Sequence, residues 1–170
     1  QLNVNGINIG LGKNSATGCT AVGASTLNAN TTSGTYNVAV GYTALFSNNS
    51  GYNNTAIGTY ALQSTTSGYQ NTVVGMYGNW LNSTGYDNTV VGYEAAYNNS
   101  GYGNTVVGKS AGKEITTGNK NTILGSYNGN QGGLDIRTSS NYIVLSDGDG
   151  NPLISTNSTR SVALNGAVPQ

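Results

Sequence analysis

The sequence predicts an all-β fold: a parallel β-roll, or β-solenoid, built of repeats of about 17 residues, with short strands at both ends. The first observation is the motif Asn-Thr-φ-φ-Gly, in which φ is apolar. It recurs at residues 54–58, 71–75, 88–92, 104–108 and 121–125, with weaker copies at 19–23 and 37–41. The second is a further glycine seven residues before the closing glycine in six copies. The third is the apolar pair in every copy, in a chain with only 7% charged residues and no histidine. Self-similarity at a fixed period is typical of stacked repeats.

The composition favours an ordered β protein over a disordered chain. Twelve tyrosines and the recurrent β-branched residues argue against disorder, which goes with high net charge and few such residues. A formal net charge of zero gives no electrostatic reason to expect a nucleic-acid partner. No stretch approaches the roughly 18–20 apolar residues that span a bilayer, so we expect no membrane insertion. Cys19 is the single cysteine and takes the place that asparagine holds in later repeats, which predicts a small, packed side chain.

Residues 1–16 are predicted to form an N-terminal strand segment. Apolar and polar residues largely alternate from Leu2 to Ile9, which is typical of a half-buried strand.

Residues 17–135 are predicted to form the repeat β-roll. Neighbouring residues of a strand point to opposite faces, and both φ columns are apolar, so both faces of this strand need cover. The first column is Ala21, Ala39, Ala56, Val73, Val90, Val106 and Ile123. The second is Val22, Val40, Ile57, Val74, Val91, Val107 and Leu124. One face can fill the inside of the coil, and we expect a homotrimer to cover the other. The alternative is a monomeric solenoid whose loops fold over the outer face.

The rest of each repeat is predicted to be a corner, a second short strand and another corner. The second strand would hold apolar pairs such as Ala44-Leu45, Ala61-Leu62 and Ala95-Ala96, and glycines admit the positive φ of tight corners. Asparagines in register are expected to stack as a structural ladder, each amide pairing with its neighbours above and below. The ladder residues are Asn54, Asn71, Asn88, Asn104 and Asn121.

Residues 136–170 are predicted to form a C-terminal hairpin and strand segment. Strand-like runs cover residues 142–145, 152–155 and 161–164, and Asp149-Gly150 is a hairpin turn signal. Terminal strands with unpaired edges favour contacts between subunits.

The sequence offers little for catalysis. Without histidine and with one cysteine, the usual nucleophile–base pairs cannot be built, and no paired-carboxylate cleft of a glycan-cleaving enzyme can be assembled. We therefore expect no enzyme and no cofactor. Asp147, Asp149 and Asn151 resemble the start of a calcium loop, but Ser158 stands where the bidentate glutamate belongs. A plain turn is the other interpretation, and the sequence predicts no metal site.

One column is a candidate for surface recognition. Five residues after the closing glycine, successive repeats place Phe46, Gln63, Trp80, Tyr97 and Lys113. Stacked coils would align Phe46, Trp80 and Tyr97 on one outer edge, and such an aromatic stripe suits contact with a sugar or a protein. Loop packing or a lateral contact between fibres is the alternative.

The repeat resembles a known class of fibre proteins. The pattern Gly-Tyr-x-Asn-Thr-φ-φ-Gly-x-x-Ala-Leu, as at residues 51–62, is similar to repeats of bacteriophage tail fibres and related secreted fibre proteins. More distantly it resembles the head repeats of trimeric autotransporter adhesins, which form parallel β-rolls in trimers, although the repeat here is longer. Residues 142–151 look like the stretch that follows such repeats in tail fibres. The resemblance implies a trimeric fibre.

Together these observations predict a structural and adhesive extracellular fibre module. The leading version is a tail-fibre-like trimeric shaft that contacts a cell surface, with copies of itself and a cell-surface glycan or protein as partners. An alternative is a subunit of a self-assembling microbial surface filament, joined through its terminal strands. A third is an ice-binding solenoid that uses a threonine file. That file runs through Thr20, Thr55, Thr72, Thr89, Thr105 and Thr122 and is broken by Val38.

Overall fold

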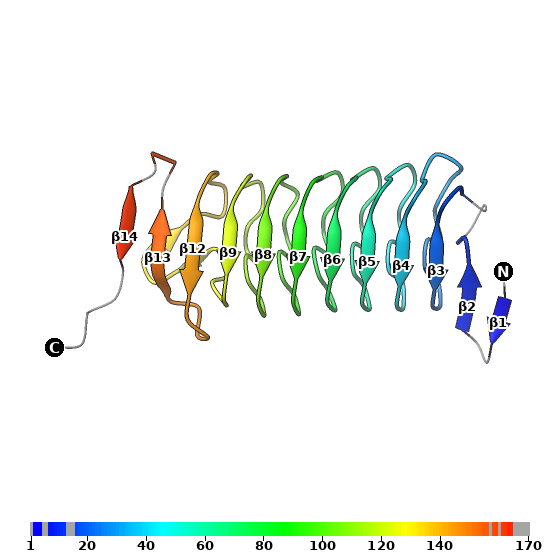
Figure 1. The fold of residues 1–170 in the computed structure, drawn as a ribbon, viewed down its shortest axis with the longest axis horizontal. Helices are drawn as coiled ribbons and strands as arrows, with labels where there is room; N and C mark the ends of the chain where they lie inside the picture. Colours follow the sequence, from blue (N-terminus) through cyan, green and yellow to red (C-terminus); the bar gives the residue numbers. More distant parts are fainter. Residues whose placement is uncertain (1, 5–6, 13–15, 157, 160, 165–170) are drawn as a thin grey trace.

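The computed structural model describes residues 2–4, 7–12, 16–156, 158–159 and 161–164, and these residues form an all-β parallel solenoid without a helix. Figure 1 shows the strands side by side along one elongated body, with β1 and β14 at its opposite ends. The main sheet has the strand order β1-β2-β3-β4-β5-β6-β7-β8-β9-β12-β13-β14. Its strands are β1 (Leu2–Val4), β2 (Ile7–Gly10), β3 (Thr20–Val22), β4 (Val38–Val40), β5 (Thr55–Ile57), β6 (Thr72–Val74), β7 (Thr89–Val91), β8 (Thr105–Val107), β9 (Thr122–Leu124), β12 (Ile143–Ser146), β13 (Pro152–Thr156) and β14 (Val162–Leu164).

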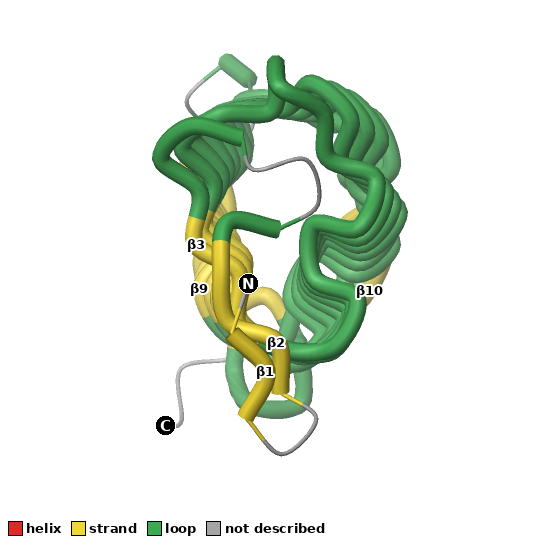
Figure 2. Tube along the Cα trace, turned by 90° about the vertical axis from the view of Figure 1, so that its right-hand side faces the viewer, coloured by secondary structure: helices red, strands yellow, loops and turns green. Residues whose placement is uncertain are grey.

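The strands β3 to β9 are the seven copies of the sequence motif, and they pair in parallel with equivalent positions opposite each other. Val73 of β6 lies opposite Ala56 on one side and Val90 on the other. Viewed along the body, the coils superpose, with the strands on one long side and loops closing the coil on the other (Figure 2). The predicted fold class and the repeat of about 17 residues are therefore confirmed.

The first φ column points into the coil and forms one wall of the core. All seven of its side chains are at most 1% exposed. Where this wall holds valine instead of alanine, the residues that face it are smaller. In one coil Ala56 packs with Ala61 and Leu62. In the next coil Val73 faces Gly78, and a Cβ added to Gly78 would lie only 2.6 Å from Val73 Cγ1. The chain thereby keeps each layer of the core filled, as close packing requires.

The far side of each coil differs from the prediction, because it contains no second strand. Residues two and four positions after the closing glycine adopt positive φ, for example Tyr60 at 62° and Leu62 at 50°. Such left-handed residues turn the chain instead of extending it. Their amides still bond to neighbouring coils. Tyr60 N–H donates to Tyr42 O of the preceding coil at 3.0 Å, and Leu45 N–H donates to Ala61 O of the following coil at 3.0 Å. Hydrogen bonds between coils thus offset the cost of the left-handed backbone.

The motif asparagines lie inside the coil as a continuous ladder. In the first four members the side-chain amide donates to the carboxamide oxygen of the preceding asparagine, for example Asn71 to Asn54 at 3.0 Å and Asn88 to Asn71 at 3.0 Å. The same amide nitrogen also donates to the next repeat, to the carbonyl of the glycine that lies seven residues before the closing one, as Asn71 does to Gly85 O at 2.8 Å. At Asn121 the backbone N–H donates to Asn104 Oδ1 at 2.9 Å, and the side-chain amide donates to Ser139 O at 2.8 Å. The members Asn54, Asn71, Asn88, Asn104 and Asn121 are all at most 1% exposed.

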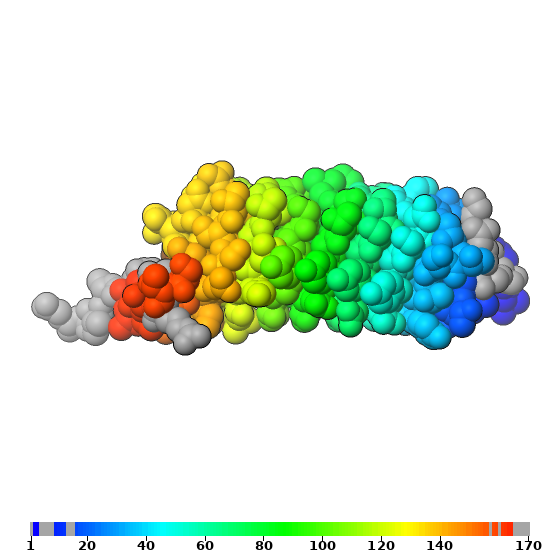
Figure 3. Space-filling view, turned by 90° about the horizontal axis from the view of Figure 1, so that it is seen from above, coloured from blue at the N-terminus to red at the C-terminus, as the bar shows by residue number. Residues whose placement is uncertain are grey.

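The two ends of the solenoid extend the sheet with antiparallel strands. The N-terminal segment is a hairpin of β1 and β2 instead of one strand, and β2 pairs with β3. At the other end, β12 continues the parallel stack, and β13 and β14 add to it in antiparallel fashion. These three strands match the three runs read from the sequence to within one residue. Figure 3 shows the resulting rod, with its coils in unbroken succession.

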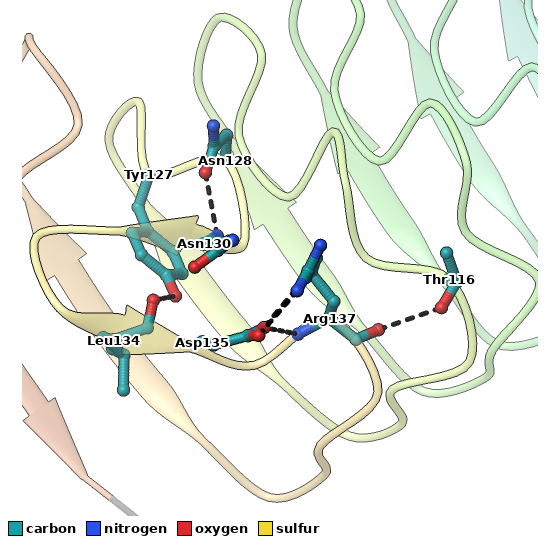
Figure 4. A network of polar contacts seen from close by, with 7 residues as sticks. All are labelled: Thr116, Tyr127, Asn128, Asn130, Leu134, Asp135 and Arg137. Atoms are coloured by element: carbon teal, nitrogen blue, oxygen red, sulfur yellow. Dashed lines mark hydrogen bonds and ion pairs between the residues drawn. The ribbon is translucent and has the colours of Figure 1, made fainter.

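A small hairpin closes the last coil. Its strands β10 (Asn130–Gln131) and β11 (Leu134–Asp135) are joined by two glycines with φ of 60° and 81°, the geometry of a type I′ turn. Beneath it lies Tyr127, which is fully buried and donates its hydroxyl to Leu134 O at 2.8 Å (Figure 4). Asp135 pairs with Arg137 at 2.8 Å, and the Thr116 hydroxyl bonds to Arg137 O at 3.3 Å. The hairpin is thereby attached both to its own coil and to the preceding one.

Replacing Tyr127 by phenylalanine should lower the free energy of unfolding by about 0.5–1.5 kcal/mol, because the hydrogen bond from the Tyr127 hydroxyl to Leu134 O would be lost. Urea denaturation followed by circular dichroism measures the change. The matched control is Tyr42→Phe, at a tyrosine that is 50% exposed, which should leave stability within about 0.5 kcal/mol. Equal stability of the two variants would contradict the role of the Tyr127 hydroxyl.

Candidate functional site

The outer face of the sheet carries a continuous apolar stripe. The second φ column points outward: Ile57, Val74 and Val91 are 40%, 37% and 38% exposed. Strand pairing continues this file at both ends, from Val22 to Ile9 and from Leu124 through Leu145 and Ile154. We call this file the outer stripe, and its members are Ile9, Val22, Val40, Ile57, Val74, Val91, Val107, Leu124, Leu145, Ile154 and Leu164.

Nothing in the described part of the chain folds over the outer stripe at its centre, since Val107 and Leu124 remain 36% and 42% exposed. The alternative in which loops of one chain cover this face is therefore wrong for these coils. The motif threonines lie on the same face, two residues before the stripe in each strand, and Thr72 and Thr89 are exposed. The threonine file of the ice-binding hypothesis thus runs beside an aliphatic file.

A second surface feature is a hollow of about 590 Å³ on the loop side of the central coils. We call it the aromatic groove. It is lined by Tyr60, Gln63, Tyr77, Trp80, Tyr93, Glu94 and Tyr97. The rings of Trp80 and Tyr97 approach to 4.9 Å between centroids, and those of Tyr60 and Tyr77 to 4.8 Å.

The groove contains two of the three residues of the predicted recognition stripe. Trp80 and Tyr97 lie together, whereas Phe46 is two repeats away from Trp80 and does not line the groove. Sequence reasoning missed Tyr77 and Glu94, which stand two positions after the closing glycine. Both have left-handed φ, at 57° and 52°, and lie beside the column five positions after it. The sequence signal was that the position two residues after the closing glycine also varies from coil to coil. That this position lies beside the one five residues after the glycine follows only from the left-handed backbone between strand and loop.

One ion pair lies at the rim of the groove. Glu94 Oε2 accepts a hydrogen bond from Lys113 Nζ at 2.8 Å. This bond lowers the pKa of Glu94, with further help from hydrogen bonds of Tyr93 and Ser110, and it raises the pKa of Lys113. Lys113 Nζ also lies 5.6 Å from the centroid of the Tyr97 ring. The carboxylate is therefore charged at neutral pH, but a cation of the protein already balances it.

A separate column of tyrosines differs from the groove. Tyr52, Tyr69, Tyr86 and Tyr102 stack with centroid distances of 5.0, 4.8 and 4.9 Å and interplanar angles of 4°, 7° and 3°. Because each face of an inner ring covers a neighbour, this column offers ring edges to a ligand and no free faces between its members.

The calcium-like sequence forms a turn. The Asp147 carboxylate accepts bonds from the backbone N–H groups of Asp149 and Asn151 and from the Asn151 side chain, at 3.0, 2.8 and 3.1 Å. The Asn151 side chain is the main cause that lowers the pKa of Asp147. Among the described residues, no three or more His, Cys, Asp or Glu side chains form a group that could hold a metal ion.

Cys19 is buried in the place of a ladder asparagine. Its Sγ donates to Gly34 O at 3.1 Å and lies 3.9 Å from Asn30 Nδ2. No helix able to cross a membrane is found in the part of the chain that the structure describes. Comparison with protein-family models, with curated proteins and with solved structures finds no match to this chain.

Proposed function

We propose that the chain is a non-enzymatic structural and adhesive module of an extracellular fibre, in which three copies form a shaft that contacts a cell surface. The observation that carries this proposal is the outer stripe. It is continuous from β2 to β14, it is apolar, and its central members remain more than a third exposed. Contiguous exposed apolar surface of this kind marks an association site.

The energetics favour association between copies of the same chain. Burying the exposed part of one stripe side chain stabilises a complex by roughly 0.5–1 kcal/mol. Side chains repeat along the stripe at the strand spacing of about 4.8 Å, so an identical stripe matches it in period along the whole rod. A contact that is favourable at one coil is therefore repeated at every coil along the rod. A closed trimer around one axis would bury the outer stripe of all three copies.

Two further observations support a role without catalysis. The chain has no histidine. The carboxylates of Glu94, Asp135 and Asp147 are held by Lys113, Arg137 and Asn151, so each already has a structural partner.

Replacing Val91 by lysine should convert the trimer to monomers, because three charges would be buried at the centre of the interface. Light scattering after size-exclusion chromatography should give about three times the chain mass of 17.3 kDa for the wild type and one chain mass for the variant. The control is Thr66→Lys, at an exposed residue outside the outer stripe, which should remain trimeric. A monomeric wild type would overturn the trimeric shaft.

The terminal strands favour a second function, a subunit of a self-assembling surface filament. The strands β1 and β14 form the two edges of the main sheet and pair on one side only. Leu2, Val162 and Leu164 there are 61%, 64% and 74% exposed. Open edges with apolar side chains pair readily with another copy. Negative-stain electron microscopy of the same samples separates the two functions, since long uniform filaments favour the second and discrete short rods the first.

A further inference from the structure

We propose that the aromatic groove binds a neutral oligosaccharide lying along the fibre axis. This inference deepens the adhesive part of the proposed function, since it names the class of ligand and the residues that hold it. Three consecutive coils contribute to the groove: the first gives Tyr60 and Gln63, the second Tyr77 and Trp80, and the third Tyr93, Glu94 and Tyr97. With coils about 4.8 Å apart, the groove extends about 10 Å along the rod. Its volume of about 590 Å³ lies within the range of ligand sites.

The ring geometry leaves apolar faces for a ligand. Trp80 is tilted by 56° against Tyr97 and by 76° against Tyr77. Rings inclined in this way do not stack face to face, and Trp80 remains partly exposed. Tyr60 and Tyr77 of the same groove do stack, at 4.8 Å and 14°, so each of these two rings covers one face of the other. An aromatic face packs well against the C–H face of a sugar ring, while tyrosine hydroxyls supply a polar edge.

Polar groups stand where they can bind sugar hydroxyls. Gln63 Oε1 accepts a bond from Trp80 Nε1, which fixes both side chains and leaves the Gln63 NH₂ to donate to a ligand. Glu94 is held in its charged form by Lys113, so its carboxylate only accepts hydrogen bonds. The Gln63 NH₂ is thus a donor and the Glu94 carboxylate an acceptor at the margin of the aromatic groove. Two neighbouring hydroxyls of a sugar ring can bind such a pair, one accepting and one donating a hydrogen bond.

The charges of the groove select a neutral ligand over an ionic one. Aromatic residues beside a carboxylate also suit a quaternary ammonium ion. Here Lys113 already lies over Tyr97 and pairs with Glu94, so a second cation would be repelled. An anion would meet the Glu94 carboxylate. A sugar without charge meets neither obstacle.

The repeat pattern indicates one local site. The asparagine and glycine columns are nearly constant from coil to coil, because stacking requires them. The two columns that build the groove vary instead: Thr43, Tyr60, Tyr77, Glu94 and Ser110 in one, and Phe46, Gln63, Trp80, Tyr97 and Lys113 in the other. Aromatic residues are concentrated in the central coils, at Tyr60 and Tyr77 of the first column and at Trp80 and Tyr97 of the second, so the groove is not a by-product of the repeat.

Trp80 is the only tryptophan of the chain, so its fluorescence reports on the groove directly. We would titrate the purified full chain with cellohexaose, maltohexaose, mannohexaose and hexa-N-acetylchitohexaose. At least one should shift the emission saturably. The variant Tyr97→Ala should weaken that binding at least tenfold by calorimetry, and Glu94→Gln provides a second test should Tyr97→Ala fail to fold. The control Tyr69→Ala removes a tyrosine of the stacked column and should bind as the wild type does.

Three results would overturn the site: no saturable change with any of the four sugars at millimolar concentration, unchanged affinity in both groove variants, or a response to choline chloride instead. Light scattering on the same samples measures the oligomeric state, so the test of the groove is independent of the test of the trimeric shaft. A trimer that ignores all four sugars disproves only the groove, and a monomer that binds one disproves only the trimeric shaft.

Discussion

Replacing Gly58 by alanine should destabilise the solenoid by about 3–6 kcal/mol, a large effect for a single methyl group. Gly58 closes the motif with φ of +136°, a conformation that is essentially restricted to glycine. An added Cβ would also lie 2.6 Å from Gly75 O and 2.7 Å from Gly75 C of the next coil. The backbone of that coil cannot move away without breaking the parallel pairing of β5 with β6. Strain and overpacking therefore act together.

Two control glycines separate these causes. Gly133 has φ of +81° but nothing within 4 Å of an added Cβ, so Gly133→Ala should cost only the left-handed backbone, about 1–2 kcal/mol. Gly148 has open space and no positive φ, so Gly148→Ala should be close to neutral. Urea denaturation gives the order of stability. If Gly58→Ala were as stable as Gly133→Ala, close approach between coils would not be the reason for the closing glycine.

Replacing Asn88 by alanine should cost about 3–5 kcal/mol, because the ladder would lose its middle member. Asn88 Nδ2 donates to Gly101 O at 2.9 Å, and Asn88 Oδ1 accepts from Asn104 N–H at 3.0 Å. Truncation leaves both of these buried backbone groups unpaired, and each such group costs about 1–3 kcal/mol. It also removes the acceptor for Asn104 Nδ2 at 3.2 Å.

The loss should be visible as a lower Tm and a lower urea midpoint. Asn49→Ala is the matched control: this asparagine is exposed, outside the ladder, and only its backbone bonds to the next coil. It should change stability by no more than about 0.5 kcal/mol. Hydrogen exchange provides a second measurement, since the Asn104 amide should lose protection in Asn88→Ala and keep it in the control. Equal protection in both variants would show that the ladder does not hold the coils together.

The period of the repeat and most of its strands could be predicted from the sequence. Because coils stack in register, any position that must pair with its own equivalent repeats at the coil length, and a period of about 17 residues is therefore readable without coordinates. The seven strands of the motif and the three C-terminal strands follow from the same local patterns. The N-terminal segment was read as one strand, although Asn5-Gly6 stands between two alternating runs and is a hairpin turn signal that this interpretation overlooked.

The tertiary structure decided three matters that local pattern leaves open. Alternation places Val90 and Val91 on opposite faces, but only the closed coil shows that Val90 is inside and Val91 outside. The prediction of a second short strand was wrong. The left-handed residues on the far side of the coils are mostly serine, threonine, tyrosine, glutamate, leucine and alanine, with one asparagine and one glycine, so residue type gives little warning of positive φ. The aromatic groove arises from that conformation, which places the ring centroids of Tyr77 and Trp80 5.8 Å apart.

The sequence by itself thus determined the all-β class, the coil length and the residues that stack, because these depend on a repeat that every coil must satisfy. Only the tertiary structure decided which apolar column remains exposed as the outer stripe and which variable side chains converge on the groove. Both depend on how the far side of the coil turns. That turn is stabilised by hydrogen bonds to neighbouring coils, such as Leu62 N–H to Gly78 O at 3.1 Å, as well as by bonds within the turn, such as Ala61 N–H to Gly58 O at 3.2 Å.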